Sequence, residues 1–118
     1  MRLPFFFSDR TITSGGIAPK RLFTLSECEY CDAKRLSAQH FALRFAAKEA
    51  FAKALGTGLR APATLNAIGV THDALGKPIY LCSDELGARL VQLGVRAHLS
   101  ISDEREYVVA FAILETLS

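Results

Sequence analysis

The stretch FAAKEAFAKALGTGL, residues 45–59, decides how this chain folds, because it is the end of one long apolar helix followed by a glycine stop. The pattern starts at Ser37 and runs to Leu55, and Gly56 supplies the stop. A helical wheel places apolar side chains on both sides of this helix. They are Phe41, Phe45 and Ala52 on one stripe, and Leu43, Ala47, Ala50 and Ala54 opposite. Little exposed surface remains for charges.

From Arg44 to its end, this helix nevertheless carries four charged residues: Arg44, Lys48, Glu49 and Lys53. They fall at i,i+4 spacings, so one interpretation is that they form ordinary ion pairs along two narrow exposed edges. The other interpretation starts from the glycines at 56 and 58, whose backbone N–H groups can turn inward as an anion nest. A carboxylate flanked by cations beside such a loop is an arrangement that could hold a metal ion and phosphates together.

The composition limits the class of protein. With 118 residues, 14 basic and 12 acidic, the chain fits one domain, residues 1–118, and its net charge of +2 is too weak to imply nucleic acid. Residues 1–26 hold four basic residues and one acidic residue, a net +3 that would suit an acidic partner. No run of 18 apolar residues occurs and the opening is too short for a signal peptide, so we expect a cytoplasmic protein without a membrane segment.

The cysteines do not indicate a disulfide framework or a zinc site. Three cysteines are an odd number in a chain without export features. Cys28 and Cys31 have zinc-like spacing, but no second Cys/His pair accompanies them. We interpret them as free thiols on a helix.

The rest of the pattern predicts an α+β fold, with helices packed on a mostly antiparallel sheet. Residues 3–7 could form a short strand, and Thr24-Leu-Ser-Glu27 is a capping box that should start a helix. Alternation around Ile68 and Val70, a turn, and residues 78–82 predict a hairpin. Ser83 should cap a helix that ends at Gly94. Residues 95–102 alternate strictly, and residues 107–114, apolar on both faces, should form a central strand after the turn at 103–106.

Four motifs together resemble one family. RFAAKEAFAKALGTG, residues 44–58, is similar to RFxxKEAxxKAxGTG, the signature of holo-acyl-carrier-protein synthases, which are small 4′-phosphopantetheinyl transferases. The order of the other three is also that of the family: FTLSE with YC in residues 23–31, HDALGKP in residues 72–78, and HLSIS followed by YVVA in residues 98–110. The resemblance covers about residues 22–115.

The resemblance implies a reaction. Members transfer the phosphopantetheine arm of coenzyme A to a serine of an apo acyl carrier protein, use Mg²⁺ and release adenosine 3′,5′-bisphosphate. Such a transfer needs a hard-cation ligand and several cations around the phosphates. By resemblance, Glu49 would be a metal ligand that helps to deprotonate the serine, and Lys53 would assist catalysis. The implied coenzyme A contacts are Arg44, Lys48, Lys53, Gly56, Thr57, Gly58 and Pro78.

The sequence departs from the family in two places. Residues 1–21 are atypical or shortened relative to the usual first strand, whose aspartate is the second metal ligand; Asp9 could be that aspartate or a solvated turn residue. Arg10, Lys20 and Arg21 would then have to dock the acidic carrier. Asp103 stands where many members have histidine, and we count it among the candidate coenzyme A contacts, although an aspartate also suits a turn.

The resemblance also implies an assembly, a homotrimer with active sites between subunits. Two other classes stay open: a module that binds coenzyme A or a carrier protein with little turnover, because the first strand is atypical, and a structural protein whose helix charges are only ion pairs. The second of these predicts no affinity for coenzyme A.

Overall fold

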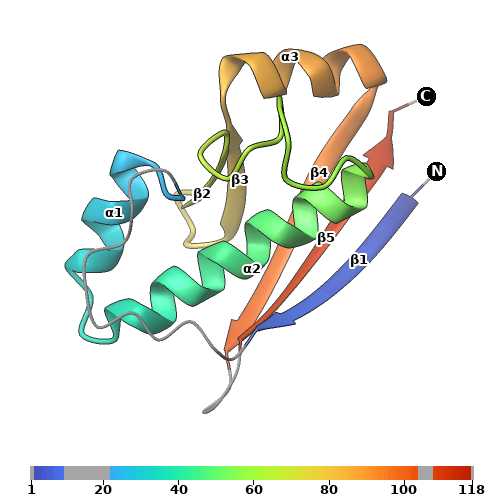
Figure 1. Cartoon of the computed structure of the whole chain (residues 1–118). Helices are drawn as coiled ribbons and strands as arrows, with labels where there is room; N and C mark the ends of the chain where they lie inside the picture. The colour runs from blue at the N-terminus through green and yellow to red at the C-terminus, as the bar shows by residue number, and fades with distance from the viewer. Residues whose placement is uncertain (1, 10–21, 104–107, 118) are drawn as a thin grey trace.

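A computed structural model describes residues 2–9, 22–103 and 108–117. Its elements follow one another in the order shown in Figure 1. They are β1 (Arg2–Asp9), α1 (Leu25–Asp32), α2 (Ser37–Leu55), β2 (Ile68–His72), β3 (Pro78–Cys82), α3 (Asp84–Leu93), β4 (Val95–Asp103) and β5 (Val108–Thr116). The predicted α+β class is confirmed, and the strands pair antiparallel throughout the part of the chain described.

The larger sheet has the order β1-β5-β4, so the strand predicted to be central is central. Asp9 at the end of β1 and Asp103 at the end of β4 are both in register with Val108, the first residue of β5. The two outer strands therefore end at the same end of the sheet, on either side of β5. Their backbones are about 10 Å apart there, twice the strand spacing. The predicted turn at 103–106 and Tyr107 lie largely outside the described residues.

Helix α2 crosses one face of this sheet and contacts β1, β4 and β5 (Figure 1). The layer between α2 and β5 is built mainly from alanine. Ala46, Ala47 and Ala50 are fully buried on the helix, and Ala110 and Ala112 are fully buried on the strand. Small side chains let the helix backbone approach the sheet closely.

The helix ends follow the sequence signals with one exception. The Thr24/Glu27 capping box is formed, and Ser83 accepts a hydrogen bond from the backbone N–H of Leu86. Helix α2 ends at Gly56, whose φ of 89° is the left-handed conformation that favours glycine. Helix α2 begins at Ser37 as predicted, but Ser37 does not cap it: the N-cap is Leu36, and no side chain caps this end.

The β2–β3 hairpin and α3 form a second layer. The predicted hairpin is confirmed, and its two strands pair from Ile68 opposite Cys82 to His72 opposite Pro78. The Tyr80 hydroxyl donates to the carbonyl of Ala47 at 2.6 Å, which fastens the hairpin to the middle of α2. Burial raises the pKa of Tyr80, so this hydroxyl keeps its proton across the physiological range.

The face of the larger sheet that points away from α2 is less covered. On β5, every second residue from Val108 to Leu114 is buried, whereas the residues between them, Val109, Phe111 and Ile113, are only half-buried. The matching positions of β4 are exposed. Among the described helices, none is long and apolar enough to cross a membrane.

Candidate functional site

The site is best described from α2 outward, starting with Lys48. Its side chain is completely buried, and its Nζ lies 2.7 Å from Glu27 Oε1, from the Leu65 carbonyl oxygen and from the Ile68 carbonyl oxygen. Three acceptors match the three N–H donors of an ammonium group. Burial lowers the pKa of Lys48 while the Glu27 carboxylate opposes that shift.

This geometry corrects two expectations. Lys48 and Arg44 do not lie on an exposed helix edge, because Arg44 is only 2% exposed and Lys48 is fully buried. The ion pair of Lys48 joins it to Glu27 of α1 rather than to its own helix. All three of its donors are used, so the prediction that Lys48 contacts coenzyme A has no support in its surroundings.

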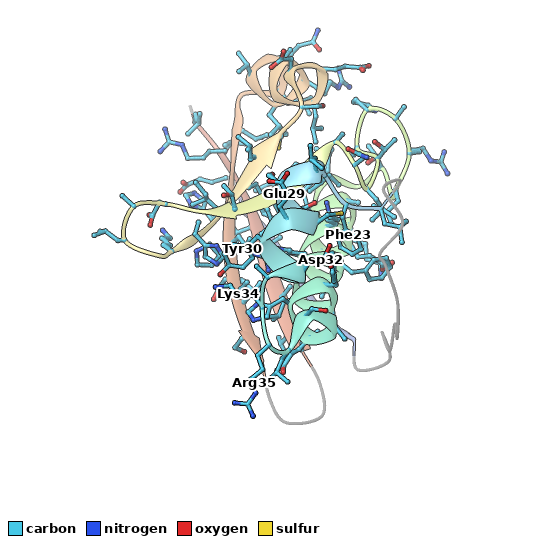
Figure 2. All side chains as sticks on the ribbon, turned by 90° about the vertical axis from the view of Figure 1, so that its left-hand side faces the viewer. Phe23, Glu29, Tyr30, Asp32, Lys34 and Arg35 are labelled. Carbon is cyan, nitrogen blue, oxygen red and sulfur yellow. The ribbon has the colours of Figure 1, made fainter. Side chains whose placement is uncertain are left out.

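Arg44 is part of a cationic cluster around Tyr30. The guanidinium carbon of Arg44 and the ammonium nitrogen of Lys34 each lie 4.5 Å from the centroid of the Tyr30 ring, which is a favourable cation–π distance. The rings of Tyr30 and His72 are 5.2 Å apart. Figure 2 shows Tyr30 and Lys34 on the side of α1 nearer the β2–β3 hairpin, with Phe23 on the other side. We call Tyr30, Lys34, Arg44 and His72 the Tyr30 cluster.

The Tyr30 cluster has more positive charge than its own acceptors satisfy. Arg44 Nη1 donates to the His40 carbonyl oxygen at 3.2 Å, but the buried Nε has no partner among the described residues. Burial, and then the charges of Arg44 and Lys34, lower the pKa of His72, while Asp73 opposes that shift. The cluster therefore disfavours any further positive charge and would favour an anion.

Glu49 and Lys53 lie on a different edge of α2. Glu49 is five positions after Arg44, a rotation of about 140° around the helix axis, whereas Lys53 is one turn from Glu49 and only about 40° away. Glu49 is half-buried and Lys53 is exposed. The structure thus keeps the predicted catalytic pair together but separates it from Arg44, so one ligand would have to extend around the helix to contact both.

The backbone of the glycine loop after α2 is hydrogen-bonded to the end of that helix. The N–H groups of Gly56 and Gly58 both donate to the Ala52 carbonyl oxygen, at 3.1 and 3.3 Å, and Thr57 Oγ1 donates to the Gly58 carbonyl oxygen at 2.9 Å. The expected anion nest from these two N–H groups was therefore wrong, because the helix end uses them. A Cβ at either glycine would meet no atom within 4 Å, so the backbone surface here is open.

The remaining predicted residues lie on three strands. Pro78 begins β3 opposite His72, close in the hairpin to the Tyr30 cluster. Asp9 and Asp103 are placed by their backbones alone, at the same end of the β1-β5-β4 sheet. Arg10, Lys20 and Arg21 lie outside the described residues.

A magnesium ion is compatible with these residues, although the described ones form no group of three or more His, Cys, Asp or Glu side chains that could hold a metal. Mg²⁺ usually keeps several waters and takes only one or two protein carboxylates together with substrate phosphates. The half-buried carboxylate of Glu49, a hard oxygen donor, fits that requirement. A zinc-type cage of nitrogen and sulfur ligands does not fit this part of the chain.

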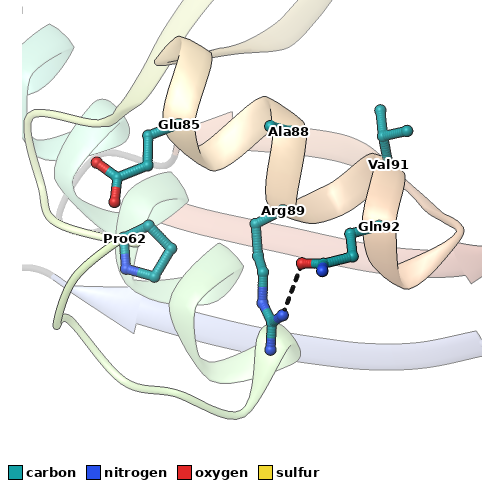
Figure 3. A pocket seen from close by; sticks show the side chains of 6 residues that line it. All are labelled: Pro62, Glu85, Ala88, Arg89, Val91 and Gln92. Carbon is teal, nitrogen blue, oxygen red and sulfur yellow. Dashed lines mark hydrogen bonds between the residues drawn. The ribbon is translucent and has the colours of Figure 1, made fainter.

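A groove of about 610 Å³ lies elsewhere, along α3. It is lined by Pro62, Glu85, Ala88, Arg89, Val91 and Gln92, and Figure 3 shows the Arg89 guanidinium hydrogen-bonded to Gln92 at 2.9 Å. No predicted site residue lines it. Its size alone is not a reason to place the chemistry there.

Sequence reasoning missed the contacts of Tyr30, Lys34 and His72 and the burial of Glu27. Tyr30 and His72 stood in recognised motifs, but no role was assigned to them. Glu27 was predicted only as the local partner of a helix cap. A signal was present in Lys48 itself, a cation on a helix with little exposed surface, because a buried ammonium group needs an acceptor from elsewhere in the chain.

Comparison with known proteins finds one family across most of the chain. Residues 7–112 match the family described as the 4′-phosphopantetheinyl transferase superfamily. A holo-[acyl-carrier-protein] synthase of Azoarcus sp. (strain BH72) is 55% identical over 97 residues, 82% of this chain and 78% of the relative. The crystal structure of a holo-[acyl-carrier-protein] synthase from Neisseria meningitidis aligns with a TM-score of 0.82 at 37% identity, over 95% of this chain and 98% of that one. A synthase from Bacillus anthracis, solved in complex with CoA (3′,5′-ADP), aligns with a TM-score of 0.70 at 34% identity, over 83% and 79%.

Proposed function

Since the chain belongs to the 4′-phosphopantetheinyl transferase superfamily, we propose that it is a magnesium-dependent holo-acyl-carrier-protein synthase. It would transfer the phosphopantetheine arm of coenzyme A to a serine of an apo acyl carrier protein and release adenosine 3′,5′-bisphosphate. The observation that carries the proposal is the match of relatives of this name over four fifths of the chain. The solved relative with CoA supports coenzyme A as the co-substrate.

The proposed roles follow the two edges of α2. Glu49 provides a carboxylate ligand for Mg²⁺, and Asp9 at the end of β1 provides a second one. The metal, when bound, supplies charge neutralisation at the pyrophosphate. Lys53, one turn further along, is exposed and so can reach phosphate oxygens or the leaving group. Glu49 also accepts the proton of the carrier serine, directly or through water.

The Tyr30 cluster supports binding of the coenzyme A phosphates at the other edge. Arg44 retains an unsatisfied buried Nε, and a phosphate would supply the acceptor. Gly56, where the helix ends, lies about 18 Å along α2 from Arg44 by the 1.5 Å rise per residue, and Thr57 and Gly58 follow it. Their open backbone gives an extended ligand a surface to lie against, and Pro78 would line the nucleotide side. We keep Asp103 as a candidate contact because its strand ends beside β5 at the same sheet end as Asp9.

We further propose a homotrimer in the cytoplasm, with sites completed between subunits. The half-buried side chains on the outer face of β5 support this, because a neighbouring copy would cover them. The distance around α2 between Arg44 and Glu49 also favours a site that draws on two chains. The basic residues of the N-terminal segment would steer the acidic carrier.

Mass spectrometry tests the function. Apo acyl carrier protein is incubated with this protein, coenzyme A and Mg²⁺, and its mass is measured against a control carrier whose acceptor serine is replaced by alanine. We expect the mass of one phosphopantetheine arm on the normal carrier only, and no transfer after chelation with EDTA. Coenzyme A binding without any mass change would overturn the proposal in favour of a binding module, and neither binding nor transfer would favour the purely structural interpretation.

A further inference from the structure

The outer edge of β2 is completed by two side chains instead of a strand. In an antiparallel pair, alternate residues direct their N–H and C=O groups away from the partner strand. Two such groups, the Ile68 carbonyl and the Val70 N–H, are bonded on that edge to Lys48 Nζ at 2.7 Å and to Glu27 Oε2 at 2.9 Å. The buried ion pair therefore stands where a neighbouring strand would lie.

The same pair also holds two other segments. Glu27 Oε1 accepts from the backbone N–H of Thr24 at 2.8 Å, which fixes the start of α1. Lys48 donates to the Leu65 carbonyl oxygen at 2.7 Å in the loop that leads into β2. Both side chains are fully buried, and the Nζ–Oε1 distance between them is 2.7 Å. One ion pair thus bonds directly to α1, α2, β2 and the preceding loop.

Each of these anchors is adjacent to a member of the Tyr30 cluster. Lys48 is one helical turn from Arg44, and Glu27 is one turn from Tyr30. Val70 is two residues from His72, on the same face of its strand. The relative placement of Tyr30, Arg44 and His72 is therefore set by bonds made at Glu27 and Lys48.

We propose that the Glu27–Lys48 pair is a positioning element of the coenzyme A site, which holds α1, α2 and β2 so that the Tyr30 cluster forms one phosphate-binding face. The ligand in this statement rests on the proposed function. Because Glu27 uses both carboxylate oxygens as acceptors and Lys48 uses all three donors, only one arrangement of the three elements satisfies the pair. A well-packed apolar contact would allow sliding that these bonds forbid.

The test compares Glu27→Gln with Leu86→Ala. Glutamine keeps the size of the side chain, but its amide NH₂ would face either the Val70 N–H or the Lys48 ammonium, donor against donor. Leu86 of α3 is fully buried in the core and bonds to neither partner, so its truncation lowers stability without touching the pair. Glu27→Asp, which keeps the charge but is one methylene shorter, serves if Glu27→Gln does not fold.

Two readouts are taken per folded molecule. The first is the Kd for coenzyme A by titration calorimetry, with kcat/KM beside it. The second is the pKa of the His72 ring, measured by NMR. Burial, Arg44 and Lys34 lower this pKa, and Asp73 opposes that shift. It reports the cluster without any ligand.

In Glu27→Gln we expect the Kd to rise about tenfold, kcat/KM to fall by up to about 10²-fold as for other small misplacements, and the His72 pKa to move up toward its ordinary value. Leu86→Ala should lower the melting temperature while leaving all three quantities at wild-type values. Wild-type Kd and His72 pKa in both Glu27 variants would overturn the proposal and leave the pair a merely stabilising role. If wild-type protein does not bind coenzyme A, the proposed function fails, and the His72 pKa still decides whether the pair positions the cluster.

Discussion

Replacement of Gly69 by alanine should destabilise the fold strongly, because a side chain on this glycine would collide with the backbone of β3. A Cβ built at Gly69 would be 2.5 Å from the Leu81 carbonyl oxygen, and 3.6 Å from Thr24 Cγ2 of the α1 cap. Ordinary contact begins at 3.4 Å, so the two strands would have to separate by about 0.9 Å at their paired residues. The obstacle is backbone within a ladder, which cannot rotate away as a side chain can.

Forced overpacking of this kind costs about 1–3 kcal/mol, and we place Gly69→Ala at the upper end because a main-chain oxygen is the atom displaced. For a chain of this size that corresponds to a fall in melting temperature of roughly 10 °C. Urea and thermal unfolding followed by circular dichroism would measure it. Because His72 and Pro78 lie on the same hairpin, affinity for coenzyme A should fall as well.

Gly87→Ala is the matched control. Gly87 is inside α3, and a Cβ there would meet no atom within 4 Å. Alanine is the better helix former, by about 0.5–1 kcal/mol, so this variant should be more stable than the wild type. A Gly69→Ala protein as stable as the wild type would refute the reasoning, since it would mean that the hairpin can open by the required distance at no cost.

Four further predictions concern the site and its surroundings. Glu49→Gln should reduce metal-dependent turnover by about two orders of magnitude with the fold intact, and normal activity at saturating Mg²⁺ would remove Glu49 from the site. Lys53→Ala should lower kcat/KM about 10²-fold with little change in melting temperature; unaltered kinetics with a large loss of stability would indicate a structural ion pair instead. Asp9→Asn should raise the Mg²⁺ concentration at half-maximal rate, whereas an unchanged value would leave Asp9 a loop residue. Burial raises the pKa of Cys31 from 9.0 to about 11, so its thiolate fraction at pH 8 is about 100-fold below that of an ordinary thiol. Mass spectrometry should find Cys31 unmodified by iodoacetamide in the native protein and modified in urea; rapid native alkylation would contradict its burial.

The sequence was a good guide to elements whose signals are local. The bounds Ser37–Leu55 for α2 follow from an apolar pattern and a glycine, and the capping box at Thr24 and Glu27 lies within one turn. The β2–β3 hairpin follows from alternation on both sides of a turn. In each case the residues that decide the structure are close together in the chain.

Features that depend on distant partners could not be predicted in this way. Lys48 and Glu27 are 21 residues apart, and nothing local indicates that the cap residue of one helix is also the counter-ion of the next. The cationic surroundings of Tyr30 likewise come from three separate elements. The prediction of an anion nest at the glycine loop was wrong for the opposite reason. The carbonyl groups at the end of α2 need local donors, and they take the N–H groups that the spacing suggested for an anion.

The alanine layer between α2 and β5 has a consequence for how this protein can change over time. In a core of leucines and phenylalanines, shortening a side chain opens a cavity and is the costly direction. Where Ala50 faces a sheet that presents Ala110 and Ala112, hardly any volume can be removed, and each added methyl group pushes a helix away from a strand. Evolutionary substitution of these alanines by larger residues is therefore disfavoured. A helix that cannot move outward also keeps the residues on its other edges, Arg44 and Glu49 among them, at a fixed height above the sheet.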